Sequence, residues 1–120
     1  MSYQTKQALI KRATLDFNSD AAAGNTLVAA VADHRICVLG MRIMAAAGVS
    51  LSLYSGDPSD AGTEIDPPAP LAENGGYVLP VTPEPDVPWL RTEKGEALTG
   101  LLSSAVRCTG ILMYYETTED

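Results

Sequence analysis

Residues 35–55, RICVLGMRIMAAAGVSLSLYS, form the longest apolar run of the chain and constrain its fold more than any other segment. In residues 49–54, VSLSLY, apolar and polar side chains alternate, and this period of two is typical of a half-buried strand. The first half is ambiguous, because its apolar residues also fall near helical spacing and the alanines at 45–47 favour a helix. We expect two strands joined by a small-residue turn over 45–48, because turn residues bound the run and a strand follows it directly.

The rest of the chain also divides into short apolar segments separated by turn residues. We expect strands at 13–17, 26–31, 76–79, 89–91, 97–103 and 108–116, and a hairpin between 26–31 and the run that begins at Arg35. Turn signals roughly every 8–12 residues are typical of sandwiches and jelly rolls. The sequence therefore predicts an all-β fold, a jelly-roll-like antiparallel β-sandwich of seven or eight short strands.

Proline and acidic residues are concentrated in the middle of the chain. All eight prolines fall between 58 and 88, and nine of the fifteen acidic residues fall between 57 and 96. Since proline cannot donate to a β-ladder, we expect this third to be mostly surface connection. The expected organisation is an N-terminal arm at 1–12, one sandwich domain at 13–116 and a frayed tail at 117–120.

The composition indicates both a core and a covered surface. Hydrophobic residues make up 46% of the chain, and charged residues make up 19%, below the roughly 25% of average soluble domains. Part of the apolar surface is therefore expected to meet a partner. The net charge of −7 disfavours binding to nucleic acid and to an anionic membrane. The N-terminal segment is locally cationic, with Lys6, Lys11 and Arg12 before the first acidic residue, and we expect it to reach an acidic surface.

Reactive residue types are scarce. The one histidine, His34, falls in a predicted turn, and a nucleophilic triad needs its imidazole beside a nucleophile. Cys37 and Cys108 are far apart in the sequence and are expected to be buried thiols in a protein made in a reducing cytoplasm. The acidic residues at 57–66 are expected to form a solvated loop rather than a calcium site. We expect no enzyme, no metal, no cofactor and no membrane span.

Three segments of the second half resemble a known group of proteins. LAENGGYVLP at 71–80, TEKGEALTGLLSSAV at 92–106 and GILMYYE at 110–116 are similar to small virion proteins of tailed bacteriophages. The strands expected at 35–39 and 48–53 lie in matching places before them. The resemblance spans roughly residues 13–116, and the segment PVTPEPDVP at 80–88 departs from it by being longer and more acidic.

The resemblance implies a capsid cement, or decoration, protein of jelly-roll fold. Such a protein binds the outside of the head across joints between major capsid proteins, often as a dimer. The partners expected are therefore the major capsid protein and a second copy of this chain. The alternative that the aromatic residues leave open is a carbohydrate- or receptor-binding module of a tail or head fibre. The residues expected to contact a partner are Lys6, Lys11, Arg12, Tyr54, Trp89 and Tyr114.

Overall fold

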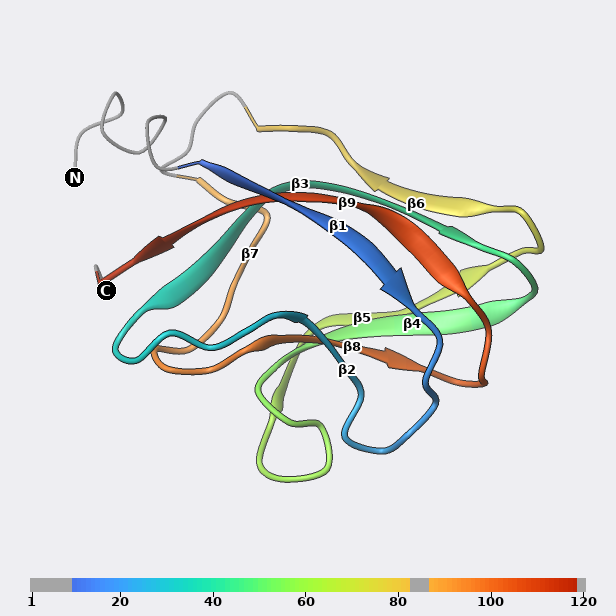
Figure 1. Cartoon of the computed structure of the whole chain (residues 1–120), viewed down its shortest axis with the longest axis horizontal. Coiled ribbons are helices and arrows are strands. Elements are labelled where there is room, and N and C mark those ends of the chain that lie inside the picture. Colours follow the sequence, from blue (N-terminus) through green and yellow to red (C-terminus); the bar gives the residue numbers. More distant parts are fainter. Residues whose placement is uncertain (1–9, 83–86, 119–120) are drawn as a thin grey trace.

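The computed structural model describes residues 10–82 and 87–118, and these fold into nine strands and no helix. Two antiparallel sheets pack face to face as two layers (Figure 1). The strands are β1 (Lys11–Phe17), β2 (Asn25–Val28), β3 (Arg35–Ala45), β4 (Val49–Ser55), β5 (Thr63–Leu71), β6 (Gly76–Leu79), β7 (Leu90–Arg91), β8 (Leu98–Leu102) and β9 (Cys108–Thr117).

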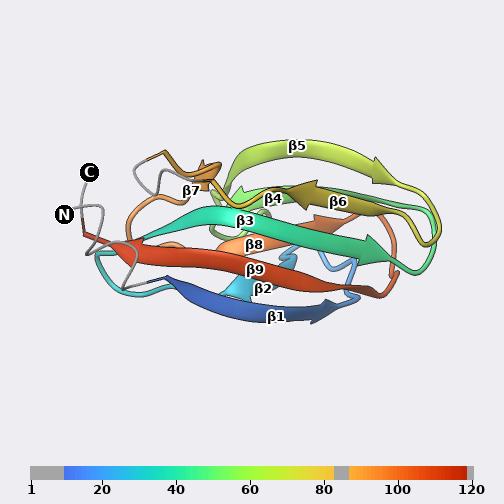
Figure 2. The same cartoon turned by 90° about the horizontal axis from the view of Figure 1, so that it is seen from above.

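The strand order identifies the topology. Sheet A has the order β1-β9-β3-β6, with the short β7 also paired to β3, and sheet B has the order β2-β8-β4-β5 (Figure 2). Apart from β7, the pairs are nested, since β1 pairs with β9, β2 with β8, β3 with β6 and β4 with β5. This nesting of eight strands is the jelly roll. The predicted jelly-roll-like β-sandwich is therefore confirmed, with nine strands among the described residues.

Both halves of the central run are strands, as predicted. β3 pairs with β9 on one side and with β6 and β7 on the other, so its backbone groups are used in ladders on both edges. The small residues at 46–48 carry the chain from sheet A to sheet B. β3 shows no clean alternation because a register shift between Val38 and Gly40 leaves both Leu39 and Gly40 on the same side.

The core lies between the sheets and is built mainly of aliphatic side chains. Its fully buried members include Ile36, Val38 and Ile43 of β3, Leu51 and Leu53 of β4, Leu98 of β8 and Leu112 of β9. Cys108 belongs to this main core, whereas Cys37 lies with Leu39 and Tyr115 in a small cluster on the other side of sheet A, against Ile10. The expectation of two buried thiols is confirmed, and burial raises the pKa of Cys108.

The predicted hairpin between 26–31 and the central run is wrong. The tight turn is present, because the His34 amide donates to the Val31 carbonyl at 3.1 Å and Asp33 has a φ of 64°. However, β2 pairs with β8 in sheet B, while β3 lies in sheet A. In this jelly roll the chain crosses from sheet B to sheet A between β2 and β3, so this turn redirects the chain across the sandwich instead of closing a hairpin.

The middle third contains a nine-residue strand, β5, although its prolines led us to expect mostly surface connection there. β5, TEIDPPAPL, pairs with β4 and forms one edge of sheet B. Proline is tolerated in an edge strand because such a strand has a neighbour on one side only, so a missing amide need not remove a hydrogen bond of the ladder. The pairing of β5 with β4 also contains two register shifts.

The outermost strands of the sandwich extend slightly beyond residues 13–116. β1 begins at Lys11, which pairs with Tyr114, and β9 extends to the buried Thr117, which pairs with Arg35. Residues 1–9, most of the expected N-terminal arm, lie outside the described residues, as do 119–120 at the expected tail.

The close approach of β9 to β3 depends on Gly110. A Cβ placed there would lie 1.8 Å from the Arg42 carbonyl oxygen. We therefore expect Gly110→Ala to lower the free energy of unfolding by about 2 kcal/mol, because relief requires moving two central strands apart. Urea unfolding measures the loss. The control is Gly48→Ala, whose new Cβ would lie 3.9 Å from the Leu71 carbonyl oxygen, an ordinary contact, and which should change stability by less than about 0.5 kcal/mol. Equal effects of the two substitutions would contradict this account.

Candidate interaction surface

The side of sheet A that faces away from the core is mapped by the strand register, because directly paired residues point to the same side. One row across β1, β9, β3 and β6 pairs Thr14 with Ile111, Ile111 with Arg42, and Arg42 with Val78. Together with the neighbouring rows it forms what we call the outer face: Arg12, Thr14, Asp16, Gly40, Arg42, Met44, Val78, Val81, Thr109, Ile111 and Met113.

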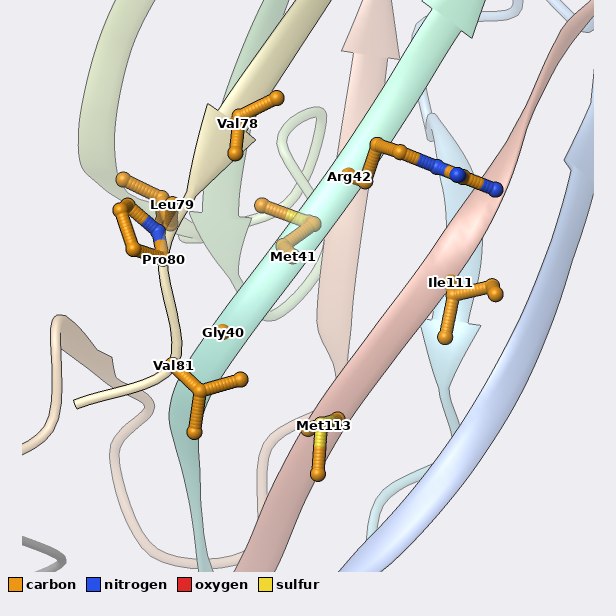
Figure 3. Close-up of a pocket in the computed structure, with 9 residues that line it drawn as sticks. All are labelled: Gly40, Met41, Arg42, Val78, Leu79, Pro80, Val81, Ile111 and Met113. Atoms are coloured by element: carbon orange, nitrogen blue, oxygen red, sulfur yellow. The ribbon is translucent and has the colours of Figure 1, made fainter. Parts of the chain in front are cut away.

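An apolar groove of about 270 Å³ runs along the middle of the outer face (Figure 3). It is lined by Gly40, Met41, Arg42, Val78, Leu79, Pro80, Val81, Ile111 and Met113. Val78 and Val81 are 64% and 54% exposed. Two exposed valines beside an apolar groove make this part of the outer face a candidate for contact with a partner.

Gly40 shapes the groove by allowing the chain after β6 to cross close to β3. A Cβ on Gly40 would lie 2.8 Å from Cγ2 of Val81 and 3.0 Å from its Cα. The Thr82 amide then donates to the Leu39 carbonyl at 2.9 Å, which fixes this crossing. The groove wall formed by Val81 is therefore held by backbone contacts.

Arg42 lines the groove, and two more arginines, Arg12 and Arg107, lie beyond it toward β1. Arg12 and Arg42 are exposed, and Arg42 extends from β3 toward β9 near Ile111 (Figure 3). Arg107 donates from Nε and Nη2 to the two carboxylate oxygens of Asp16 at 3.1 and 3.0 Å. This bidentate pair holds the pKa of Asp16 below its usual range and raises the pKa of Arg107. A second hollow, of about 440 Å³, lies among these four charged residues.

Tyr77 fixes the position of β6 and therefore of Val78 beside it. Its hydroxyl donates to the carboxylate of Asp66 on β5, and this bond links sheet A to sheet B. Burial, and then the hydrogen bond to Asp66, raise the pKa of Tyr77 well above its usual range. The phenol stays neutral and keeps donating.

Of the residues predicted to contact a partner, two lie at the groove. Arg12 belongs to the outer face, where it pairs across strands with Met113. Trp89 is 49% exposed, and its indole Nε1 donates to the carbonyl of Pro80, a lining residue, at 2.7 Å.

The other predicted contact residues lie elsewhere. Lys11 forms an ion pair of 3.0 Å with Glu116, which raises the pKa of the lysine. Tyr114 packs against the main core, and Tyr54 belongs to β4 in the opposite sheet. Lys6 lies outside the described residues. The structure therefore does not bring the aromatic residues together on one surface.

Sequence reasoning missed the apolar lining of the groove, although a signal for part of it was present. In β9, CTGILMYYET, both alternating sets are apolar, so Leu112 faces the core while Ile111 and Met113 face outward. A strand that lacks a polar side predicts a second buried or partner-covered face. The position of Val81 depends on the bulge in β3, and no pattern in the sequence predicts that position.

The residues considered for chemistry serve turns in the structure. The Oδ1 of Asp57 accepts from the Ser59 amide at 2.8 Å and from its hydroxyl at 2.6 Å, which lowers the pKa of Asp57. His34 Nδ1 lies 2.8 Å from the Ala32 carbonyl oxygen. Within residues 10–82 and 87–118, no group of three or more His, Cys, Asp and Glu side chains is placed to hold a metal ion. The same ranges contain no helix long and apolar enough to cross a membrane.

Comparisons with known proteins add little. No protein-family model matches the chain, and a search of curated proteins finds no match. Among solved structures, the chain is similar to one in the structure of infectious bursal disease virus, Gx strain, with 12% identity and a TM-score of 0.28. The alignment covers 88% of this chain and 36% of that chain. A similarity this weak carries no argument, so the resemblance to bacteriophage cement proteins stays a prediction.

The link between Tyr77 and Asp66 predicts a loss of stability in alkali. An unfolded tyrosine ionises near pH 10, whereas folded Tyr77 does so only at higher pH. Its contribution is therefore fully present below about pH 10 and is lost as the pH rises further. We expect Tyr77→Phe to lower the free energy of unfolding by about 1 kcal/mol at pH 7 and to flatten its decline above pH 10.

The matched control for this measurement is Tyr54→Phe, because the Tyr54 hydroxyl has no hydrogen bond to the described residues. Urea unfolding from pH 7 to pH 11 compares both variants with the unsubstituted protein. An unchanged alkaline slope in Tyr77→Phe would show that the link between the sheets contributes nothing.

Proposed function

We propose that this protein is a virion structural protein that attaches to the outside of a bacteriophage head as a capsid cement protein. The observation that carries the proposal is the outer face, an exposed sheet surface of a jelly-roll sandwich, with an apolar groove and arginines on the β1 side of that groove. A cement protein requires a rigid domain of this kind, with one surface that binds the capsid. The resemblance of the second half to phage virion proteins supports the same role.

In this proposal the protein acts by binding alone. It is not an enzyme and takes no cofactor, its main partner is the major capsid protein, and it joins the particle in the host cytoplasm. Many copies on one shell strengthen the joints between capsid proteins, because each bound domain adds an attachment that must open before neighbouring subunits separate.

The proposal extends to self-association through β1. The β5 edge of sheet B carries three prolines, which hinder strand addition, whereas the seven-residue β1 edge of sheet A contains none. Within the described residues β1 pairs only with β9, and in this proposal an antiparallel strand from a second copy adds to its other edge.

Sedimentation equilibrium tests this pairing. We expect a mass of about twice the 12.6 kDa of one chain at micromolar concentration, because strand addition satisfies backbone groups on both copies. A mass of one chain at all concentrations up to the millimolar range would contradict a dimer.

Counting bound copies on bare heads tests the cement role. Heads that lack this protein are mixed with increasing amounts of the purified chain, and the bound protein is quantified against the major capsid protein. We expect saturation at a fixed stoichiometric ratio and a higher temperature of head disruption, since added contacts stabilise the assembled state.

Two other outcomes are informative. Absence of binding would contradict the cement role. Binding confined to the fivefold vertices, together with retention on a glycan array, would favour the alternative of a carbohydrate- or receptor-binding module of a fibre.

A further inference from the structure

We infer that the outer face of sheet A is the docking surface of this protein and that its occupant is an acidic protein surface with an apolar side chain at its centre. The inference deepens the proposed function and rests on it for the identity of the partner. The chemistry of the partner comes from the outer face itself.

The centre of the outer face is apolar and is complementary to an apolar side chain of a partner. Val78 and Val81 stand more than half exposed, and Ile111 and Met113 form the opposite wall of the groove. Its volume of about 270 Å³ is at the low end of small-molecule sites, and Arg42 is the one polar side chain among the described residues that line it, whereas such sites use several placed polar groups. It therefore suits an inserted side chain better than a whole ligand.

The exposed arginines near the groove are complementary to negative charge on a partner. Arg12 and Arg42 are exposed on either side of β9, and the one carboxylate among the outer-face residues, Asp16, is already paired with Arg107. The chain as a whole carries a charge of −7, so this face has the opposite sign to the body. Complementary potentials orient partners and speed their encounter, which favours an acidic partner surface.

Other occupants fit less well. Nucleic acid and anionic membranes are bound through clusters of Lys and Arg that contact phosphate groups, whereas this groove is apolar and Arg12 and Arg42, exposed near it, are too few to form such a cluster. A second copy docked face to face by a two-fold axis would place the same arginine-rich surface against itself. A protein partner with acidic and apolar side chains avoids both conflicts.

Charge reversal on bare heads tests the inference where the cement role holds. We expect Arg12→Glu/Arg42→Glu to weaken head binding by at least about tenfold, since two attractive contacts become repulsive. Lys94→Glu, in the turn between β7 and β8, is the control and should bind like the unsubstituted protein. Val78→Asp should weaken binding similarly, while Val31→Asp, at another exposed valine, should not. Unfolding curves confirm that each variant is folded.

Equal binding by the outer-face variants and their controls would overturn the inference while leaving the cement role intact. Failure of the unsubstituted protein to bind heads would instead overturn the cement role. In that case a titration with a twelve-residue peptide of alternating glutamate and leucine, followed by methyl NMR, decides the inference.

In this titration we expect the methyl signals of Val78, Val81, Ile111 and Met113 to shift, and the shifts to disappear in Arg12→Glu/Arg42→Glu. No shift at the outer face, or shifts on sheet B, would overturn the inference. Larger shifts with duplex DNA or with phosphatidylserine vesicles would assign a different class of partner and overturn it. Shifts of Val78 and Val81 that depend on protein concentration alone would identify a second copy as the occupant of the groove and would also overturn the inference, because these residues lie at the edge of sheet A opposite to β1.

Discussion

The long antiparallel ladder between β3 and β9 is the interaction on which the rest of this structure depends. It runs from Arg35 paired with Thr117 to Ala45 paired with Cys108 and joins the middle of the sequence to its end. On its inner side it supplies much of the core, and on its outer side it supplies the floor of the groove. The close approach of Gly110 to the Arg42 backbone and the register shift before Gly40 are both features of this ladder. Fold and surface are therefore set by one pair of strands.

The sequence predicted the elements of this fold better than their partners. The alternation in 49–54 and the apolar run before it led to β4 and β3, because burial imposes a period that survives in the residue pattern. The false hairpin after 26–31 shows the limit, since a turn of correct local geometry does not reveal which sheet the next strand joins. β5 was missed because proline disfavours central strands, and only the tertiary position at an edge makes it acceptable.

The candidate surface was also predictable only in part, because it depends on which strands become neighbours in the fold. Charge and aromatic content led to Arg12 and Trp89, which lie on the outer face and near its groove, but equally to Tyr114, which packs against the core. Those residue types serve cores and interfaces alike, so composition cannot separate the two roles. The groove itself arises where β6, β3 and β9 lie side by side (Figure 2), and no local pattern encodes that juxtaposition.

In the proposed function one face of the sandwich does the binding. A cryo-EM reconstruction of heads decorated with this protein tests the claim most directly, because it fixes the orientation of the domain. We expect sheet A to face the shell, with the side chains of Arg42 and Val78 at the contact and β5 turned toward solvent. A domain bound through sheet B, with the outer face of sheet A open to solvent, would contradict it.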